Sequence, residues 1–298
     1  MNRSLAVFIL VLAIACTAFG ASDEVVRFGL ITDVHAHDID SPFEGKWMSH
    51  TAERLTTFTT AMTAWSPDFV IELGDFINGW VVLGTEPGDP ARMPDILAWA
   101  DSLYDQFDGP AYHVLGNHDL FNLDKSQVLE ILDEDATSYS FDVGSFHFIV
   151  LDVQFATDGS DLENTYMGVA GFVPESEIAW LRADLAATDH PTVVCVHQPL
   201  DENAEEIEAW GRATVLNQDA LRDLFVEDGQ VIAVLQGHDH TNDHRIISGI
   251  HYITFEAMVD QGTPATWAQI TLDPTLQRLL IEGIGVQASY ELTYSVQD

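Results

Sequence analysis

The sequence predicts an α/β protein in which two mixed β-sheets pack face to face, with helices on the outer faces. Two observations lead to this fold class. Short apolar runs alternate with amphipathic helical patterns in the first half of the chain, and hairpin-like pairs of strands dominate the second half. The 298 residues are 47% hydrophobic, which is enough apolar material for a core between two sheets and beneath their helices.

The first 21 residues have the features of a secretory signal peptide. Arg3 precedes an apolar stretch too short to cross a bilayer comfortably, and "AFGA" at 18–21 offers a cleavage site between small residues. We therefore expect residues 1–21 to be removed, residues 22–298 to form a single domain, and the mature protein to be secreted or periplasmic. The alternative is a lipoprotein signal in which Cys16 is acylated; without that lipid, no stable membrane association is expected.

Each later element is assigned from its apolar period and from its flanking residues. Strands are apolar or alternating runs bounded by Gly, Pro, Asp or Asn, whereas helices repeat apolar residues three and four positions apart. The expected strands are 25–33, 68–75, 111–117, a hairpin over 138–152, 192–197, 231–237, a hairpin over 244–255, and a closing hairpin of 266–273 and 276–283. The expected helices are 49–65, 94–107, 124–133, 174–187 and 216–227.

The chain is strongly acidic, with 11 Lys and Arg against 48 Asp and Glu and a net charge of −37. The acidic residues are scattered, and the only lysines are Lys46 and Lys125. We expect this composition in a protein adapted to high salt, where screening weakens self-repulsion. Such a surface should repel nucleic acid and anionic membranes. An anionic substrate would need positive charge inside its site, and metal ions could provide that charge without any lysine.

The long apolar strands that helices flank end in Asp, Asn or His. The segment "YHVLGNHDLF" (112–121) shows the pattern, because its apolar run stops at Gly116 and three polar residues follow. In open α/β sheets, ligands gather at the carboxyl ends of strands, so these side chains are expected to converge in one cleft. They are Asp33, His35, Asp75, Asn117, His118, His197, His238 and His240.

These residue types are the ligands that hard and borderline divalent cations prefer. Asp33 and His35, like His238 and His240, are two positions apart, so both members of each pair can reach one ion from the same side of an extended chain. A carboxylate can bridge two ions with its two oxygens. The sequence therefore favours a pair of divalent metal ions (Mn, Fe or Zn). The one cysteine after the leader, Cys195, lies in an apolar run and is expected in the core.

The order D-x-H, G-D, G-N-H-D, H and G-H-x-H over residues 33–240 resembles the calcineurin-like metallophosphoesterase superfamily. The resemblance covers nearly the whole mature chain and implies the αββα fold of that superfamily. It also implies a role for each site residue. The first metal would be held by Asp33, His35 and His240, the second by Asn117, His197 and His238, and Asp75 would bridge the two. His118 would act beside the scissile phosphate, and Asp119 would orient His118.

Six stretches are similar to the manganese-dependent ADP-ribose/CDP-alcohol diphosphatase branch of the superfamily. They are "FGLITDVHAHD" (28–38), "LGDFINGW" (73–80), "GNHDLFN" (116–122), "FHFIVLD" (146–152), "GFVPESEIAWL" (171–181) and "GHDHTN" (237–242). The chain departs from that branch at His35, where the branch commonly has Gln; Asp-x-His is the commoner superfamily pattern. Purple acid phosphatases have a tyrosine ligand shortly after the G-D motif. The corresponding "GDFING" (74–79) contains none, so a tyrosine–iron site is not implied.

The expected activity is hydrolysis of a small phosphodiester, pyrophosphate-linked or phosphomonoester substrate. A metal-bound hydroxide would attack phosphorus, and His118 would assist the leaving oxygen. A cyclic-nucleotide phosphodiesterase and an alkaline-phosphatase-like phosphomonoesterase are the alternatives within this class. A binding module that keeps the scaffold without catalysis is disfavoured, because every ligand position and His118 are filled.

Overall fold

The computed structural model describes residues 24–38, 45–79, 90–163, 170–202, 214–260 and 264–296. The expected signal peptide (1–21) lies outside these described residues. Among the helices of the described ranges, none is long and apolar enough to cross a membrane.

The first sheet has six strands in the order β12-β11-β10-β1-β2-β3. They are β1 (Val26–Ile31), β2 (Phe69–Glu72), β3 (Ala111–His113), β10 (Trp267–Asp273), β11 (Arg278–Ile284) and β12 (Tyr290–Thr293). Strands β1, β2 and β3 pair in parallel, and β10 pairs antiparallel with β1. The sequence did not predict β12, which is only four residues long and extends the closing hairpin.

The second sheet also has six strands, in the order β4-β5-β6-β7-β9-β8. They are β4 (Tyr139–Val143), β5 (Phe146–Val150), β6 (Thr192–Val196), β7 (Val231–Gln236), β8 (Asp243–Ile247) and β9 (Ile250–Thr254). Strands β5, β6, β7 and β9 are parallel, whereas the hairpin partners β4 and β8 are antiparallel edges. Both predicted hairpins of this sheet are therefore present.

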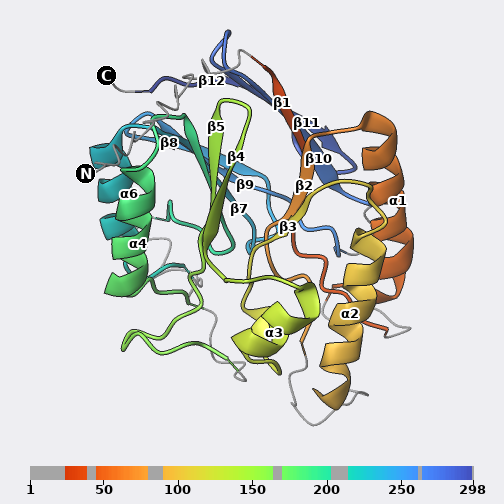
Figure 1. The fold of residues 1–298 in the computed structure, drawn as a ribbon. Coiled ribbons are helices and arrows are strands. Elements are labelled where there is room, and N and C mark those ends of the chain that lie inside the picture. The colour runs from red at the N-terminus through yellow and green to blue at the C-terminus, as the bar shows by residue number, and fades with distance from the viewer. Residues whose placement is uncertain are drawn as a thin grey trace, which may run out of the picture.

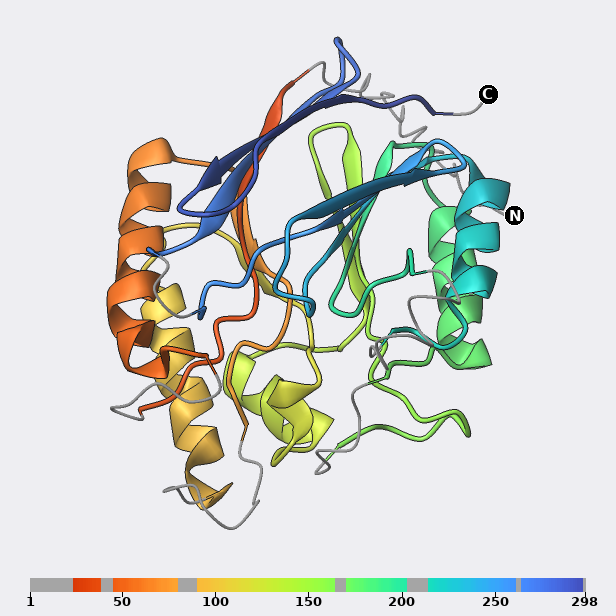
Figure 2. The same ribbon diagram turned by 180° about the vertical axis from the view of Figure 1, so that it is seen from behind.

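Helices cover the outer face of each sheet (Figures 1 and 2). Helices α1 (Thr51–Trp65) and α2 (Met93–Tyr104) share a buried cluster with side chains of the first sheet. On the other side of the molecule, α4 (Glu175–Leu185) and α6 (Gln218–Asp228) pack on the second sheet. The short helix α3 (Lys125–Leu132) follows β3, and Asp124 caps it by accepting from the backbone nitrogen of Gln127.

The sheets meet through aromatic and aliphatic side chains. Phe28 on β1 stacks on Phe69 of β2 with ring centroids 4.8 Å apart, and Phe148 of β5 meets Phe69 edge-on at 5.0 Å. Because side chains alternate along a strand, Phe28 enters this inter-sheet core while Ile31 packs under the helices. The predicted fold class, two mixed sheets face to face with flanking helices, is confirmed.

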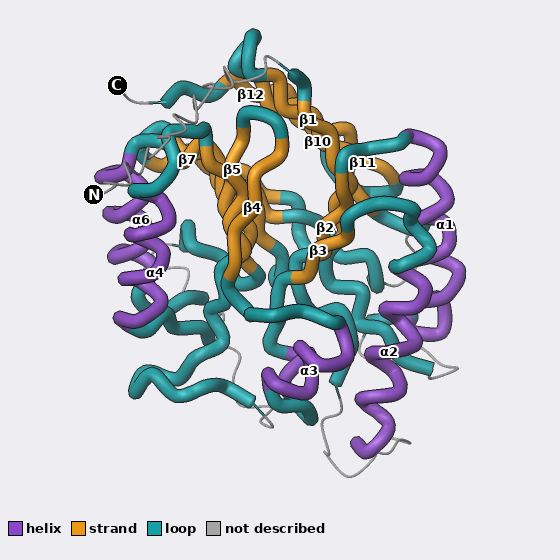
Figure 3. Tube along the Cα trace, viewed as in Figure 1, coloured by secondary structure: helices purple, strands orange, loops and turns teal. Residues whose placement is uncertain are grey.

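The loops that follow the parallel strands gather at one edge of the sandwich (Figure 3). Backbone hydrogen bonds join them directly. The nitrogen of Asp33, after β1, donates to the carbonyl oxygen of Gly74, after β2, at 3.1 Å. Gly237, after β7, donates to the carbonyl of His197, after β6, at 3.0 Å. This edge is where the sequence predicts the site.

Candidate metal centre

The structure brings the predicted ligands with ionisable side chains together at this edge. Three overlapping groups have ligand atoms that all lie within 4.8 Å of one another. The groups are Asp33, His35 and His240; Asp75, His197 and His238; and His35, Asp75 and His118.

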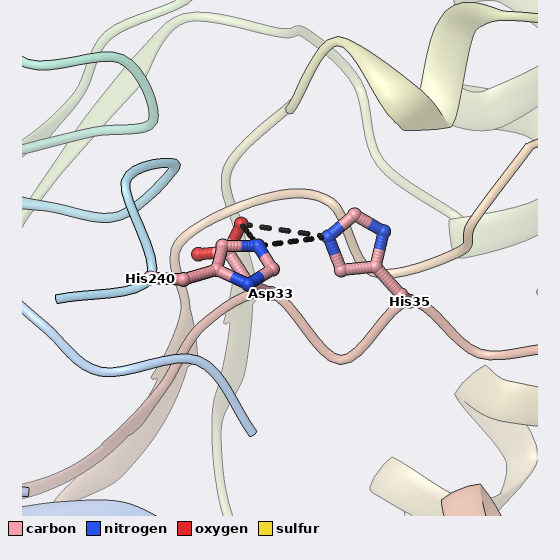
Figure 4. A group of neighbouring side chains, drawn as sticks. All are labelled: Asp33, His35 and His240. Carbon is pink, nitrogen blue, oxygen red and sulfur yellow. Dashed lines mark hydrogen bonds and ion pairs between the residues drawn. The ribbon is translucent and has the colours of Figure 1, made fainter. Parts of the chain in front are cut away.

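The first group joins the loop after β1 to the loop after β7 (Figure 4). His240 Nε2 lies 3.2 Å from Asp33 Oδ1 and 3.2 Å from His35 Nε2. The other oxygen of Asp33 is already occupied, because Oδ2 accepts from Thr32 Oγ1 and from the backbone nitrogen of His238. One oxygen of Asp33 and the Nε2 atoms of two imidazoles therefore face a common point.

The second group forms around His197 and His238, whose Nε2 and Nδ1 atoms lie 3.2 Å apart. Asp75 connects the two groups. Its Oδ1 lies 3.3 Å from His197 Nε2, and its Oδ2 lies 3.6 Å from His35 Nε2. The two oxygens of one carboxylate thus face different ligand groups, which is the arrangement needed to bridge two ions.

Unsatisfied polar atoms in this cluster fit bound metal ions. Oδ1 of Asp33 and the side-chain amide of Asn117 are buried without a hydrogen-bond partner among the described residues. Leaving such atoms unpaired costs about 1–3 kcal/mol each, so they require another partner. Carboxylate, amide oxygen and imidazole match the preferences of divalent cations such as Mn²⁺, and the residues present therefore fit the two predicted ions.

Outer hydrogen bonds fix the orientation of three ligand imidazoles. His240 Nδ1 contacts Asp260 Oδ1 at 2.8 Å, and His35 Nδ1 contacts Asn78 Oδ1 at 3.1 Å. His197 Nδ1 donates to the carbonyl oxygen of Leu73 at 2.8 Å. Each contact directs Nε2 of the ring toward the cluster, as outer partners do in metal sites. The sequence did not predict Asp260 or Asn78, because neither belongs to a ligand motif.

Protonated imidazoles balance the negative charge of the two buried carboxylates in the site. Burial opposes ionisation of both carboxylates, but nearby imidazoles outweigh it, so the pKa values of Asp33 and Asp75 lie well below their usual range. Burial also disfavours charge on His197 and His240. The adjacent carboxylates prevail and raise the pKa to about 9 for His197 and to about 10 for His240. These two imidazoles must release protons when they bind a metal ion.

The other two imidazoles are already in the form that binds metal. Burial, with a positive neighbour as the second cause, lowers the pKa of His35 to about 4 and that of His238 to about 3. Both rings are therefore neutral at physiological pH, as ligation requires.

The ligand loops have an unusual backbone. Non-glycine residues rarely adopt positive φ, which costs roughly 1–2 kcal/mol per residue. Positive φ occurs at Asp33 (52°), His35 (43°), Asp75 (53°), His238 (70°) and His240 (53°). At Gly116, a Cβ atom would lie 2.1 Å from the nitrogen of Asp75, so only glycine lets these two loops touch. Strain of this kind is concentrated where function requires it.

His118 lies beside both ligand groups, and its outer nitrogen contacts a main-chain carbonyl oxygen. Its Nδ1 donates to the main-chain carbonyl oxygen of Asn78, and its Nε2 lies 4.0 Å from Asp75 Oδ2. Burial lowers the pKa of His118 well below its usual value. The substrate-free ring is therefore neutral, and Nε2 presents a lone pair to the site.

The carboxylate of Asp119 accepts hydrogen bonds from backbone amides, and its role toward His118 stays a prediction. Its Oδ2 accepts from the backbone nitrogens of Gly116 (2.8 Å) and Asp75 (3.0 Å), and its Oδ1 accepts from that of Ile77 (2.9 Å). The main-chain carbonyl oxygen of Asn78 accepts from Nδ1 of His118. Because three amides converge on it, Asp119 ties the loop after β3 to the loop after β2.

Known proteins share both the sequence pattern and the fold. Residues 26–242 match the family described as calcineurin-like phosphoesterase. The chain is 25% identical over 320 residues to the manganese-dependent ADP-ribose/CDP-alcohol diphosphatase of Oryza sativa subsp. japonica, covering 91% of this chain and 95% of the relative. The Arabidopsis thaliana protein of the same name is 24% identical over 312 residues, covering 88% and 95%.

The solved structure of a dimetal phosphatase from Danio rerio has the same fold, with a TM-score of 0.72 and 21% identity. The match covers 91% of this chain and 99% of that one. Family match, fold and ligand groups agree. The chain belongs to the calcineurin-like phosphoesterase family and is a metal-dependent hydrolase that uses divalent metal ions.

Proposed function

We propose that this enzyme hydrolyses small pyrophosphate-linked nucleotides of the kind represented by ADP-ribose and CDP-alcohols. The observation that carries the proposal is the position of Asp75, whose two oxygens face two separate ligand groups. Such a pair of sites suits displacement at phosphorus, where both attacking and leaving oxygens need positive charge. The names of the relatives from rice and Arabidopsis support this substrate class among the possible phosphate esters.

Divalent cations in these groups would neutralise phosphate oxygens and acidify a water molecule. The chain's own residues would position the reacting groups and donate a proton to the leaving oxygen. The carbonyl of Asn78 fixes the ring of His118, so that Nε2 points away from the backbone and toward the cluster. Donation of a proton to a leaving oxygen requires the charged imidazolium, and an anionic phosphate beside the ring would stabilise that form.

A second candidate substrate class follows from His35. Its Nε2 belongs to the first group, so that group has an imidazole where the diphosphatase branch commonly has an amide. This difference favours the broader specificity of the superfamily, including phosphomonoesters and cyclic nucleotides.

A substrate panel separates these candidates. The mature chain, loaded with Mn²⁺, should be assayed with ADP-ribose, CDP-choline, cyclic AMP, and nitrophenyl mono- and diesters. The proposal expects the highest kcat/KM for ADP-ribose or CDP-choline. Highest activity on cyclic AMP or on the monoester would support the second candidate instead. Asp75→Ala, purified in parallel, controls for contaminating phosphatases.

We also propose that the enzyme is exported, because residues 1–21 have the charge, length and small-residue pattern of a signal peptide. Expression of the full chain, followed by mass spectrometry of the processed N-terminus, tests this. Cleavage after Gly20 or Ala21 supports export. A lipid attached to Cys16 supports the lipoprotein alternative, and an intact Met1 in the cell interior contradicts both.

A further inference from the structure

Glu72 is a buried carboxylate that belongs to none of the ligand motifs. It ends β2 within the apolar stretch "FVIELG" (69–74), and only 1% of its surface is exposed. Burial of a carboxylate is costly unless hydrogen bonds or an opposite charge satisfy both of its oxygens. An apolar side chain would suit this position in the sheet better, so the partners of Glu72 indicate why a carboxylate is present.

The two oxygens of Glu72 have different partners. Oε2 accepts a hydrogen bond from the backbone nitrogen of Gly74 at 2.8 Å. Oε1 lies 3.1 Å from Nδ1 of His113, which is on the neighbouring strand β3. Nε2 of His113 in turn lies 3.5 Å from Oδ1 of Asp101 on α2. One oxygen is therefore anchored to the sheet and to α2, and the other holds the main chain directly before Asp75.

The turn that Glu72 holds, residues 73–75, contacts three other ligand residues. Its successive carbonyl oxygens accept hydrogen bonds at 2.8, 3.1 and 2.9 Å from His197 Nδ1 and from the backbone nitrogens of Asp33 and His35. His197 belongs to the second ligand group, whereas Asp33 and His35 belong to the first. The position of this turn therefore determines how the two groups lie relative to each other.

The conformation of the turn requires support from outside it. Gly74 and Asp75 both have positive φ, at 94° and 53°, and this conformation is unfavourable for an aspartate. The turn is also crowded, because a Cβ atom on Gly74 would lie 2.7 Å from the nitrogen of Gly116 and from Nδ1 of His197. The carboxylate of Glu72 supplies that support by accepting from the buried amide at the centre of the turn.

We propose that Glu72 is a positioning residue of the metal centre. By holding the amide of Gly74, it fixes the turn that carries Asp75 and so sets the spacing of the two ligand groups. The hydrogen bond carries this role, so an uncharged acceptor at the same place should serve as well. The inference concerns the assembly of the metal centre, and it is independent of which phosphate ester the enzyme hydrolyses.

Two variants at position 72 separate the hydrogen bond from the charge. Glu72→Met keeps roughly the size of the side chain but removes both acceptor oxygens. Glu72→Gln keeps one acceptor for the Gly74 amide, and its NH2 group can donate to Nδ1 of a neutral His113.

Asp152→Leu is the matched control. Asp152 is also fully buried after a strand, and its Oδ1 accepts from the backbone nitrogen two residues later, that of Gln154, at 2.8 Å. Its Oδ2 pairs with Lys125 at 2.7 Å. This variant therefore removes a carboxylate with the same kind of contacts, but from a turn that carries no ligand.

Binding of Mn²⁺ is measured by calorimetry, and the Mn²⁺-loaded proteins are compared by electron paramagnetic resonance. A bridging carboxylate couples the electron spins of two Mn²⁺ ions, so the spectrum reports the bridge without any turnover. Glu72→Met should bind at least one ion roughly 10–100-fold more weakly and lose the coupled spectrum. Glu72→Gln should retain both ions and the coupled spectrum. Asp152→Leu should have a lower melting temperature and an unchanged spectrum.

A wild-type affinity and spectrum in Glu72→Met would overturn the inference, as would a wild type without a coupled spectrum. Equal losses in Glu72→Gln and Glu72→Met would also overturn it, because they would show that the charge is required. The same loss in Asp152→Leu would show an effect of general destabilisation instead. None of these readouts depends on a substrate, so failure of the proposed function leaves the test intact.

If Glu72→Met does not fold, amide exchange measured by nuclear magnetic resonance decides. The wild type and Glu72→Gln are loaded with diamagnetic Zn²⁺ for this measurement. The amide of Gly74 should exchange slowly with solvent in both proteins, because each has an acceptor for it. Exchange as fast as that of an exposed loop, in either protein, would overturn the inference.

Discussion

The carboxylate of Asp119 lies 3.0 Å from the backbone nitrogen of Asp75, the residue whose two oxygens face both ligand groups. Asp119 therefore controls the position of the bridging residue through its main chain. The G-N-H-D motif consequently combines the expected ligand Asn117, the predicted substrate-facing residue His118 and a residue that holds the neighbouring loop.

Replacing Asp119 with Asn should reduce metal retention. An amide side chain keeps one acceptor oxygen and presents an NH2 group to backbone amides, so the loops of Gly116 and Asp75 lose hydrogen bonds. Each buried amide left unpaired costs about 1–3 kcal/mol. We expect a lower Mn²⁺ content and a higher Mn²⁺ requirement for activity, with equal losses for good and poor leaving groups.

Asp124→Asn is the matched control, because Asp124 also accepts a hydrogen bond from a backbone amide, at the start of α3. It should lower the melting temperature slightly and retain both metal ions. Full metal content in Asp119→Asn, together with a loss confined to poor leaving groups, would support the prediction that Asp119 acts through His118.

Replacing Asp75 with Ala should remove both metal ions and nearly all activity, because its oxygens are shared between the two groups. Asp260→Ala should cause a smaller loss of metal affinity than Asp75→Ala. It removes only the outer partner of His240, so affinity for one ion should fall roughly 10–100-fold. Metal analysis by mass spectrometry checks both. Two tightly bound ions in Asp75→Ala would contradict the bridge.

A buried histidine away from the ligands makes stability depend on pH. His113 Nδ1 lies 3.1 Å from Glu72 Oε1. Burial lowers the pKa of His113, but the hydrogen bond and charge of Glu72 outweigh it, and the pKa is raised above 6.5. A raised pKa stabilises the fold below the unfolded value of about 6.5, and this stabilisation is lost as pH rises through the folded value.

His113→Gln should abolish this part of the pH dependence. As the pH rises above about 6.5, the melting temperature of the wild type should fall relative to that of the variant, as followed by circular dichroism. His190→Gln, a partly exposed site on the loop before β6, controls for the loss of an imidazole. Parallel curves for the wild type and His113→Gln would show that the Glu72 contact does not raise the pKa.

The sequence predicted which of these side chains converge, because their positions depend on strand ends. Asp33, His197 and His238 each follow an apolar run, and the parallel pairing of such runs places their ends at one edge. The outer partners could not be predicted in this way. Asp260 meets His240, and Lys46 meets His35, only after separate loops have folded together. The hydrogen-bond partners of Asp119 were missed for the same reason.

Mutation can distinguish whether His118 donates a proton or binds a metal ion. Because its Nε2 lies 4.0 Å from Asp75 Oδ2, within the third potential ligand group, geometry alone allows either role. If His118 supplies a proton, His118→Ala should retain both metal ions. Its kcat for an alkyl phosphate ester should fall by roughly 10²–10⁴-fold, the usual contribution of a positioned acid.

The dependence on the leaving group distinguishes proton donation by His118 from stabilisation of phosphoryl charge. Nitrophenolate departs without a proton, so the nitrophenyl ester should be hydrolysed nearly as fast by His118→Ala as by the wild type, whereas an alkoxide needs the proton. Burial makes the substrate-free ring of His118 neutral, so the acid role also requires the bound phosphate to raise its pKa. Equal losses for both esters with metals retained would show that His118 stabilises phosphoryl charge. Loss of one metal ion would place His118 among the ligands.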